Sequence, residues 1–352
     1  MDSGLRYPFY LYPPKQFRII QTRLSLLCLS PESQRVNIKE ENTMIQTVLA
    51  QAVAAARPAA ELGQTASYIP ELSKVDKHQL GACVFTADGG RFSAGDTKVR
   101  FSIQSISKVI SLAAALELCG FETVFAQVGM EPSGDAFNAM GKLEAAGSSP
   151  SNPMINAGAI AVDSYLEPKI SFDKMLAFTR KLCMDPEIVL DEKVYHSEMS
   201  NISRNRAIAY LLENKGVIRS DVERTLDFYV RMCSLSVTAE SLAGLGLLLA
   251  GGGICPATGE RLLSPDTVRV VKTIMLTCGM YDGSGTFAVQ VGIPSKSGVG
   301  GGILSVVDRR MGIGIFGPAL DGKGNSVAGE RVLRHLSQQL HLHIFDTDSQ
   351  TD

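Results

Sequence analysis

Two features that would place a chain outside the soluble globular enzymes are missing from this sequence of 352 residues. No uncharged apolar run approaches the roughly 18 residues that a membrane span needs, and the longest candidate, residues 241–255, is rich in glycine. Lys and Arg number 34 against 36 Asp and Glu, so no excess of positive charge favours nucleic acid or an anionic membrane. These absences exclude an integral membrane protein, and we expect neither a nucleic-acid partner nor a membrane partner.

Patterns of metal binding and disulfide pairing are also missing. The seven cysteines contain no C-x-x-C pair, and two of the five histidines lie in the C-terminal tail. An odd number of scattered cysteines predicts neither a disulfide framework nor a structural metal site. We therefore expect free thiols, a cytoplasmic location and no bound metal.

What is present is the composition of a globular chain, with 45% hydrophobic and 20% charged residues. Residues 1–43 differ from the rest and lack the compact apolar region of a signal peptide. We interpret them as a dispensable N-terminal extension. An amphipathic helix is predicted directly after Met44, over residues 45–56, because apolar side chains recur there at helical spacing.

The predicted strands lie near both ends of the remaining chain, with helices between them. They cover residues 80–87 and 91–94, which flank an Asp-Gly turn, and residues 286–291, 302–307 and 311–316. A last helix is predicted over residues 326–340. We expect an α+β fold in which residues 44–104 plus 278–345 form an antiparallel sheet flanked by helices, residues 105–277 form an inserted helical domain, and residues 346–352 are a tail.

The sharpest motif surrounds Ser105. This serine lies three residues before Lys108, at the start of an almost wholly apolar stretch that predicts a buried helix. The spacing places both side chains on one helix face, where a lysine that burial keeps neutral can activate a serine nucleophile. The same S-x-x-K spacing at Ser171 predicts only a helix cap, and capping is the alternative role for Ser105.

A second motif, Lys296-Ser297-Gly298, runs into a predicted strand. K-[ST]-G on a strand is the usual distant partner of S-x-x-K in serine acyl-transfer enzymes, and a backbone N–H beside it can complete an oxyanion hole. Tyr281 lies in a glycine-rich loop just before the final strands, where it is placed either to relay a proton or simply to pack. The two motifs together favour a serine acyl-transfer enzyme.

Two glycine motifs resemble nucleotide-binding sequences but lack the context that such sites need. Residues 312–317 spell G-x-G-x-x-G inside an apolar strand, and Pro318 follows them rather than a helix. Residues 317–324 nearly match a phosphate-binding loop, yet no Ser or Thr follows Lys323. We interpret the first as a strand and the second as a turn, and we predict no organic cofactor.

Taken in order, the motifs between Tyr68 and Phe345 strongly resemble those of the serine-dependent glutaminase family. The matching stretches are Y-I-P-E-L at 68–72, G-D-T-K-V at 95–99, Gln104-Ser105 with Lys108, E-P-S-G at 131–134, N-P-M-I-N-A-G-A at 152–159, S-E at 197–198, R-N at 204–205, D-F-Y at 227–229, C-G-M-Y at 278–281 and K-S-G-V at 296–299. The resemblance implies a β-lactamase-like fold and an amidohydrolase that converts L-glutamine to L-glutamate and ammonia. It also implies a homo-oligomer, either a dimer or a tetramer.

The resemblance further implies a role for each site residue. Ser105 is the expected nucleophile, Lys108 its base and Tyr281 the proton relay, and the backbone N–H groups of Ser105 and Val299 are the expected oxyanion hole. The expected substrate-binding residues are Tyr68, Asn156, Glu198, Asn205 and Tyr229, with Gln104 helping to orient them. Glu198 suits the α-ammonium of glutamine, because a buried carboxylate is tolerated only beside a cationic partner.

Two other interpretations stay open on the residues alone. β-Lactamases and penicillin-binding peptidases use the same serine, lysine and K-S-G groups, but no export signal is evident in this sequence. A ligand sensor of the same fold would keep the pocket and release no product.

Overall fold

The computed structural model describes residues 31–134, 141–144 and 149–346. The chain divides into two compact units, residues 1–44 and residues 45–352. The first helix of the described residues, α2 (Pro31–Ala56), begins well before Met44, where the sequence predicted its start. Its residues Ile45, Leu49 and Val53 are buried, so the predicted apolar face of residues 45–56 is confirmed.

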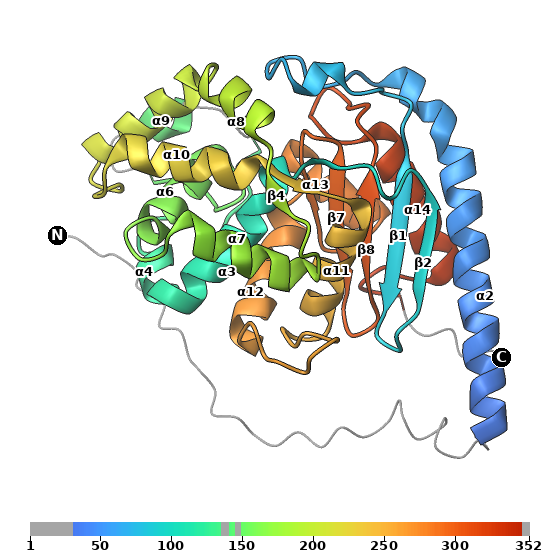
Figure 1. The fold of residues 1–352 in the computed structure, drawn as a ribbon. Coiled ribbons are helices and arrows are strands. Elements are labelled where there is room, and N and C mark those ends of the chain that lie inside the picture. Colours follow the sequence, from blue (N-terminus) through green and yellow to red (C-terminus); the bar gives the residue numbers. More distant parts are fainter. Residues whose placement is uncertain (1–30, 135–140, 145–148, 347–352) are drawn as a thin grey trace. The chain divides into compact units, whose positions relative to one another are not determined.

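The main sheet of the second unit joins strands from both ends of the chain (Figure 1). Its strands are β1 (Gly81–Thr86), β2 (Arg91–Gly95), β6 (Ser295–Ser297), β7 (Gly302–Val307) and β8 (Met311–Phe316). They pair antiparallel in the order β2-β1-β8-β7-β6, and Gly81 of β1 lies opposite Phe316 of β8. The predictions of an Asp-Gly hairpin and of one sheet built from distant halves are therefore confirmed.

Alternate residues of this sheet enter two different hydrophobic cores. On one face, Ala82, Ile313 and Ile315 pack with residues of α2 from Ile45 onward and with α14 (Val327–Leu340). On the other face, Cys83, Leu304 and Val306 pack with the helical part of the chain, including α11 (Ala239–Ala250). The sheet is thus covered by helices on both faces, as Figure 1 shows for α11 and α14.

The G-x-G-x-x-G segment is part of β8, as predicted, and its glycines let α11 pack closely on the strand. A Cβ atom added to Gly312 would lie 2.0 Å from the backbone nitrogen of Leu247, and one added to Gly314 would lie 2.0 Å from the carbonyl oxygen of Ala239. Residues 317–324 form an irregular segment and a turn, also as predicted. The glycine motifs therefore serve packing and chain reversal.

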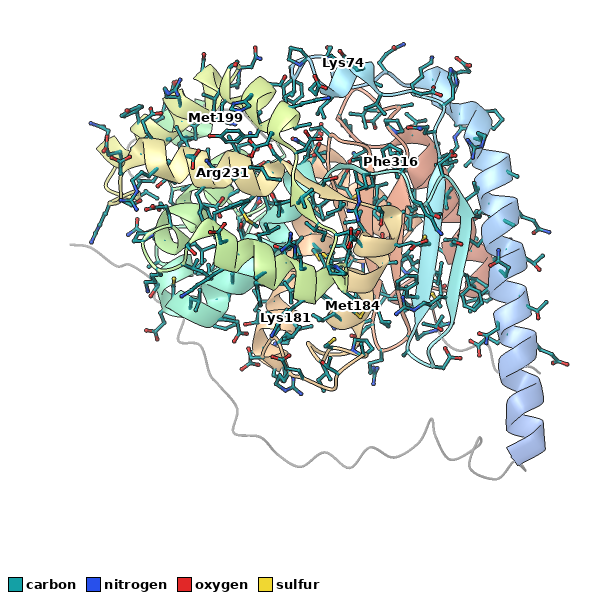
Figure 2. All side chains as sticks on the ribbon, in the orientation of Figure 1. Lys74, Lys181, Met184, Met199, Arg231 and Phe316 are labelled. Carbon is teal, nitrogen blue, oxygen red and sulfur yellow. The ribbon has the colours of Figure 1, made fainter. Side chains whose placement is uncertain are left out.

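Between the two halves of the sheet the chain is mostly helical, as expected. Its helices are α3 (Ser107–Cys119), α4 (Phe121–Phe125), α5 (Gly141–Glu144), α6 (Asn156–Leu166), α7 (Phe172–Cys183), α8 (Glu192–Met199), α9 (Ser203–Asn214), α10 (Val222–Cys233), α11 and α12 (Pro265–Cys278). Three short strands that were not predicted form a second antiparallel sheet in the order β3-β5-β4: β3 (Phe101–Ser102), β4 (Val189–Leu190) and β5 (Leu235–Val237). Phe101 of β3 stacks on Phe316 of β8 with ring centroids 4.4 Å apart, which anchors the segment before Ser105 to the main sheet. Figure 2 labels Phe316 among the side chains of the molecule.

The strand predicted over residues 286–291 is wrong, because this segment forms helix α13 (Ser284–Gln290). Phe287 and Val291 are buried, whereas Val289 between them is 80% exposed. A strand would place all three side chains on one face, so burial at positions i and i+4 marks a helical turn. The last helix was predicted well: Ser326 caps α14 by accepting a hydrogen bond from the backbone N–H of Gly329 at 3.1 Å.

Candidate active site

Ser105 and Lys108 face one another where the chain enters α3. The segment Gln104–Ile106 is a short 3-10 helix, and α3 begins at Ser107. Lys108 Nζ donates a hydrogen bond to Ser105 Oγ at 2.8 Å, and both side chains are buried. No side chain caps the N-terminus of α3, so the alternative role of Ser105 as a helix cap is excluded.

The surroundings of Lys108 favour its neutral form. The side chain is only 2% exposed, and burial lowers the pKa of Lys108, against the opposing effect of nearby Cys233, Glu198 and Asp163. Its Nζ also donates to Asn156 Oδ1 at 2.9 Å. The contact between Nζ and Ser105 Oγ can run in the opposite sense when the amine is neutral, so this geometry suits a general base.

Asn156 links the lysine to a second amide. Asn156 is the first residue of α6, and its Nδ2 donates to Oδ1 of Asn205 on α9 at 2.9 Å. The ring of Tyr229, on α10, lies 5.7 Å from Lys108 Nζ. Residues from four helices that are far apart in sequence therefore meet beside the buried Lys108, with Asn205 at the half-buried end of the group.

Glu198 supplies a buried carboxyl group to the same region. It lies near the end of α8, and its Oε2 accepts a hydrogen bond from Gln104 Nε2 at 3.3 Å. Burial raises the pKa of Glu198 to about 7, against the effects of Gln104 and Lys108. No ion-pair partner for this carboxyl is found within the described part of the chain, and a buried carboxylate is stabilised by a cationic partner.

Tyr281 approaches the serine from the C-terminal half of the chain. The residue is buried, and burial raises the pKa of Tyr281, whereas the Ser105 side chain and the backbone of Val299 lower it. Lys296 Nζ lies 4.4 Å from the centre of the Tyr281 ring and donates to the carbonyl oxygen of Ser297 at 2.6 Å. The K-S-G strand β6 and the tyrosine thus lie beside the S-x-x-K segment.

The backbone at the site is held in an uncommon conformation. Gln104 and Tyr281 have φ angles of +48° and +54°, in the left-handed region that residues other than glycine seldom adopt. The turn after β6 passes close to the segment before Ser105, since a Cβ added to Gly300 would lie 2.3 Å from the carbonyl oxygen of Ser102. Such local strain is typical of functional sites, where the surrounding packing holds a reactive geometry in place.

The remaining expected residue, Tyr68, lies at the edge of this cluster. Its side chain is 54% exposed, and it is close enough to Tyr281 and Glu198 to interact with them electrostatically. The sequence did not single out Asp163 or Cys233, both of which are buried near Lys108. Asp163 carried a signal that was overlooked: it follows Asn156 by seven residues, which places both on one face of α6.

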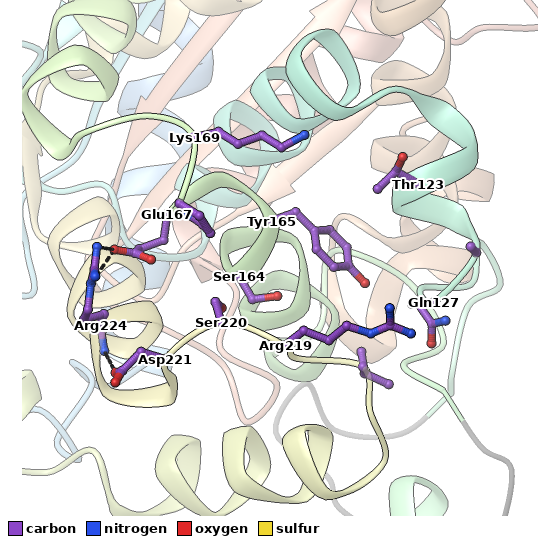
Figure 3. Close-up of a pocket in the computed structure, with 13 residues that line it drawn as sticks. Thr123, Gln127, Ser164, Tyr165, Glu167, Lys169, Arg219, Ser220, Asp221 and Arg224 are labelled. Carbon is purple, nitrogen blue, oxygen red and sulfur yellow. Dashed lines mark hydrogen bonds and ion pairs between the residues drawn. The ribbon is translucent and has the colours of Figure 1, made fainter.

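A large cavity among the described residues lies away from this site. A surface cavity of about 810 Å³, lined mainly by α4, the end of α6 and the chain before α10, contains the exposed Arg219 and the ion pair of Arg224 with Glu167 (Figure 3). None of the expected site residues lines it. A smaller cavity of about 170 Å³ reaches Tyr281 and Ile155, the residue before Asn156.

Two further properties concern the described residues alone. None of their helices combines the length and the apolar composition that crossing a membrane demands. Nor do the described histidine, cysteine and carboxylate side chains gather in a group of three that is suited to a metal ion.

Comparison with known proteins identifies the family. A family model described as Glutaminase matches residues 63–345. Glutaminase 2 of Clostridium perfringens is 51% identical over 289 residues, which cover 81% of this chain and 95% of that protein. The glutaminase of Clostridium tetani is 48% identical over 306 residues, covering 86% of this chain and 100% of that protein.

A solved structure agrees with these relatives. The covalent complex of Bacillus subtilis glutaminase with 5-oxo-L-norleucine, formed by reaction with 6-diazo-5-oxo-L-norleucine, superposes with a TM-score of 0.78 at 40% identity. The match covers 85% of this chain and 99% of that one. The predicted β-lactamase-like fold class is confirmed. The chain belongs to the glutaminase family.

Proposed function

We propose that this protein hydrolyses L-glutamine to L-glutamate and ammonia through a glutamyl ester on Ser105. The observation that carries the proposal is the contact of 2.8 Å between Ser105 Oγ and the buried Lys108 Nζ. A serine is a weak nucleophile until a base removes its proton, and burial prepares Lys108 to be that base.

The chemistry begins with Ser105 Oγ attacking the γ-carboxamide carbon while Lys108 takes the hydroxyl proton. The backbone N–H groups of Ser105 and Val299 bind the oxyanion that develops. Tyr281, whose raised pKa keeps it protonated at neutral pH, relays a proton to the leaving nitrogen, so that ammonia departs. A water molecule then cleaves the ester and releases glutamate, and no step needs a metal or an organic cofactor.

Different residues recognise the positive and the negative end of the substrate. The buried carboxylate of Glu198, held by Gln104, pairs with the α-ammonium of glutamine. The neutral groups of Asn156, Asn205 and Tyr229 bind the α-carboxylate, and Tyr68 covers the entrance from its half-exposed position. This arrangement is supported by the contacts of Asn156 and Tyr229 with Lys108, and by those of Asn205 with Asn156 and of Gln104 with Glu198.

The cellular setting is part of the same proposal. We propose a cytoplasmic homo-oligomer, a dimer or a tetramer, in which residues 1–43 are dispensable. The six described cysteines are free, which suits a reducing compartment. Light scattering of the purified protein measures the oligomeric state, and a monomer at working concentration contradicts that part.

The test of the proposed function is ammonia release from L-glutamine by the purified full chain. We expect turnover, and we expect 6-diazo-5-oxo-L-norleucine to leave a covalent adduct that mass spectrometry locates in peptide 101–108. Glutamine binding without ammonia release indicates a sensor. Hydrolysis of nitrocefin in place of glutamine indicates a β-lactamase-like enzyme. Either result overturns the proposal.

A further inference from the structure

Asp163 is a buried carboxylic acid to which the proposed mechanism gives no role. It lies on α6, seven residues or about two helical turns after Asn156, and so on the same face as the amide that holds Lys108. Its side chain is 2% exposed, and its Oδ1 has no hydrogen-bond partner among the described residues. A buried, incompletely bonded carboxyl group destabilises a fold, so its presence calls for an explanation.

The groups around Asp163 connect it to the catalytic lysine. From α3, Ser111 hydrogen-bonds to the carboxyl group and Lys108 attracts it electrostatically. From α10, the thiol of Cys233 faces it, and burial raises the pKa of that thiol to about 12, so the thiol carries no charge at neutral pH. Burial raises the pKa of Asp163 itself to about 7, against the effects of Ser111 and Lys108.

We propose that Asp163 is a positioning residue for the hydrolase, whose buried carboxyl group controls the charge of Lys108 from α6. The inference rests on the proposed function, in which Lys108 acts as a neutral base. An ionised carboxylate favours the ammonium form of a neighbouring lysine, so ionised Asp163 opposes the form that Ser105 requires. The two groups then titrate as a coupled pair.

Glu198 also interacts with Lys108, but its charge has a different partner once the substrate is bound. In the proposed complex the α-ammonium of glutamine neutralises Glu198. Asp163 has no such ligand partner, and therefore it is the carboxyl group that continues to act on Lys108 while the substrate is bound. Its charge is expected to set the acid limb of the pH–rate profile.

The test compares the pH dependence of kcat at saturating glutamine for the wild type and Asp163→Asn, measured as ammonia release, because kcat reports the groups that titrate in the enzyme–substrate complex. Without the carboxylate, Lys108 loses its proton more readily. We expect the acid limb to move to lower pH by about half a unit or more, which corresponds to roughly a threefold gain in the neutral fraction of the base at acid pH. A purely structural role would lower kcat by the same factor at every pH.

Two further variants sharpen the comparison. Ser111→Ala removes a hydrogen bond that favours the ionised form of Asp163, so the acid limb of this variant should move in the same direction by a smaller amount. This variant carries the test if Asp163→Asn does not fold.

Glu330→Gln is the matched control. Burial also raises the pKa of Glu330, on α14, to about 7, but its charged neighbours are Asp321, Arg334 and Lys323 rather than Lys108. Its acid limb should stay in place.

The possible outcomes distinguish a failure of the Asp163 inference from a failure of the proposed glutaminase function. An unmoved acid limb in a folded, active Asp163→Asn or Ser111→Ala variant overturns the role of Asp163 and leaves the glutaminase proposal intact. If the wild type releases no ammonia at any pH, the proposed function fails. The coupling is then measured by a double-mutant cycle of Asp163→Asn and Lys108→Met on unfolding, where additive effects contradict the inference and non-additive effects support it.

Discussion

Lys108 shares its buried surroundings with two carboxyl groups, those of Glu198 and Asp163. An exposed lysine holds only about one part in 10³ of its amine in the neutral form at pH 7. Burial lowers the pKa of Lys108 and raises those of both acids to about 7, so it favours the neutral form of each of the three groups.

The serine assignment predicts a loss of turnover without a loss of binding. In Ser105→Ala, kcat should fall by a factor on the order of 10⁴ or more, because the nucleophile is gone, while the groups that bind glutamine remain. Ammonia release and calorimetric binding measure the two effects. Ser171→Ala is the matched control, since that serine has the same S-x-x-K spacing but caps α7. It should keep full turnover and lose about 1 kcal/mol of stability. Full activity in Ser105→Ala would show that Ser105 is not the nucleophile.

Glu198 should make glutamine binding depend on pH. Its carboxyl has a pKa of about 7 in the free protein and must be ionised to pair with an ammonium group, so affinity should weaken as the pH falls below about 7. Glu198→Gln should weaken binding by about 2 kcal/mol and flatten this dependence, as titration calorimetry across pH can measure. Glu192→Gln, at an exposed position on the same helix, is the control and should bind as the wild type does. Unchanged affinity in Glu198→Gln would place the ammonium elsewhere.

At the scale of elements, the contact of α11 with β8 depends on the absence of side chains. Gly312→Ala should destabilise the protein by about 1–3 kcal/mol, because its Cβ would overlap the backbone of α11 and neither element can move far in a packed core. Chemical unfolding monitored by circular dichroism measures the change. Gly322→Ala is the control, since nothing lies within 4 Å of an added Cβ there. Equal stability of the two variants would show that the contact is loose.

The elements also show where prediction from local pattern succeeds and fails. β1 and β2 were predicted because an Asp-Gly turn separates two apolar runs, and β7 and β8 because their apolar runs are long enough to be distinctive. The strand predicted over residues 286–291 rests on a short apolar run, which fits both the two-residue period of a strand and the 3.6-residue period of a helix. Only the burial of Phe287 and Val291 on one helical face shows that the segment is a helix. β3, β4 and β5 span two or three residues each, too few for any period to show.

At the scale of the whole molecule, the second compact unit begins at Ile45. A chain that starts at Met44 keeps the buried face of α2, so we expect the deletion of residues 1–43 to leave kcat/KM and the melting temperature unchanged. Deletion of residues 1–56 is the matched comparison. It removes Leu49 and Val53 from the core and should destabilise the protein strongly, because each buried aliphatic side chain contributes about 1.5–3 kcal/mol. Loss of activity in the shorter deletion would contradict the proposal that the extension is dispensable.

The sequence by itself predicted candidate residues for the chemistry and determined how near neighbours are arranged. The S-x-x-K spacing, the Asp-Gly hairpin and the apolar helix faces are local, because each depends on positions a few residues apart. Only the tertiary structure decided which charges surround Lys108. Asn156, Asp163, Glu198 and Cys233 reach it from distant segments. The charge on a buried group depends on distance and burial, and neither quantity is encoded by spacing along the chain.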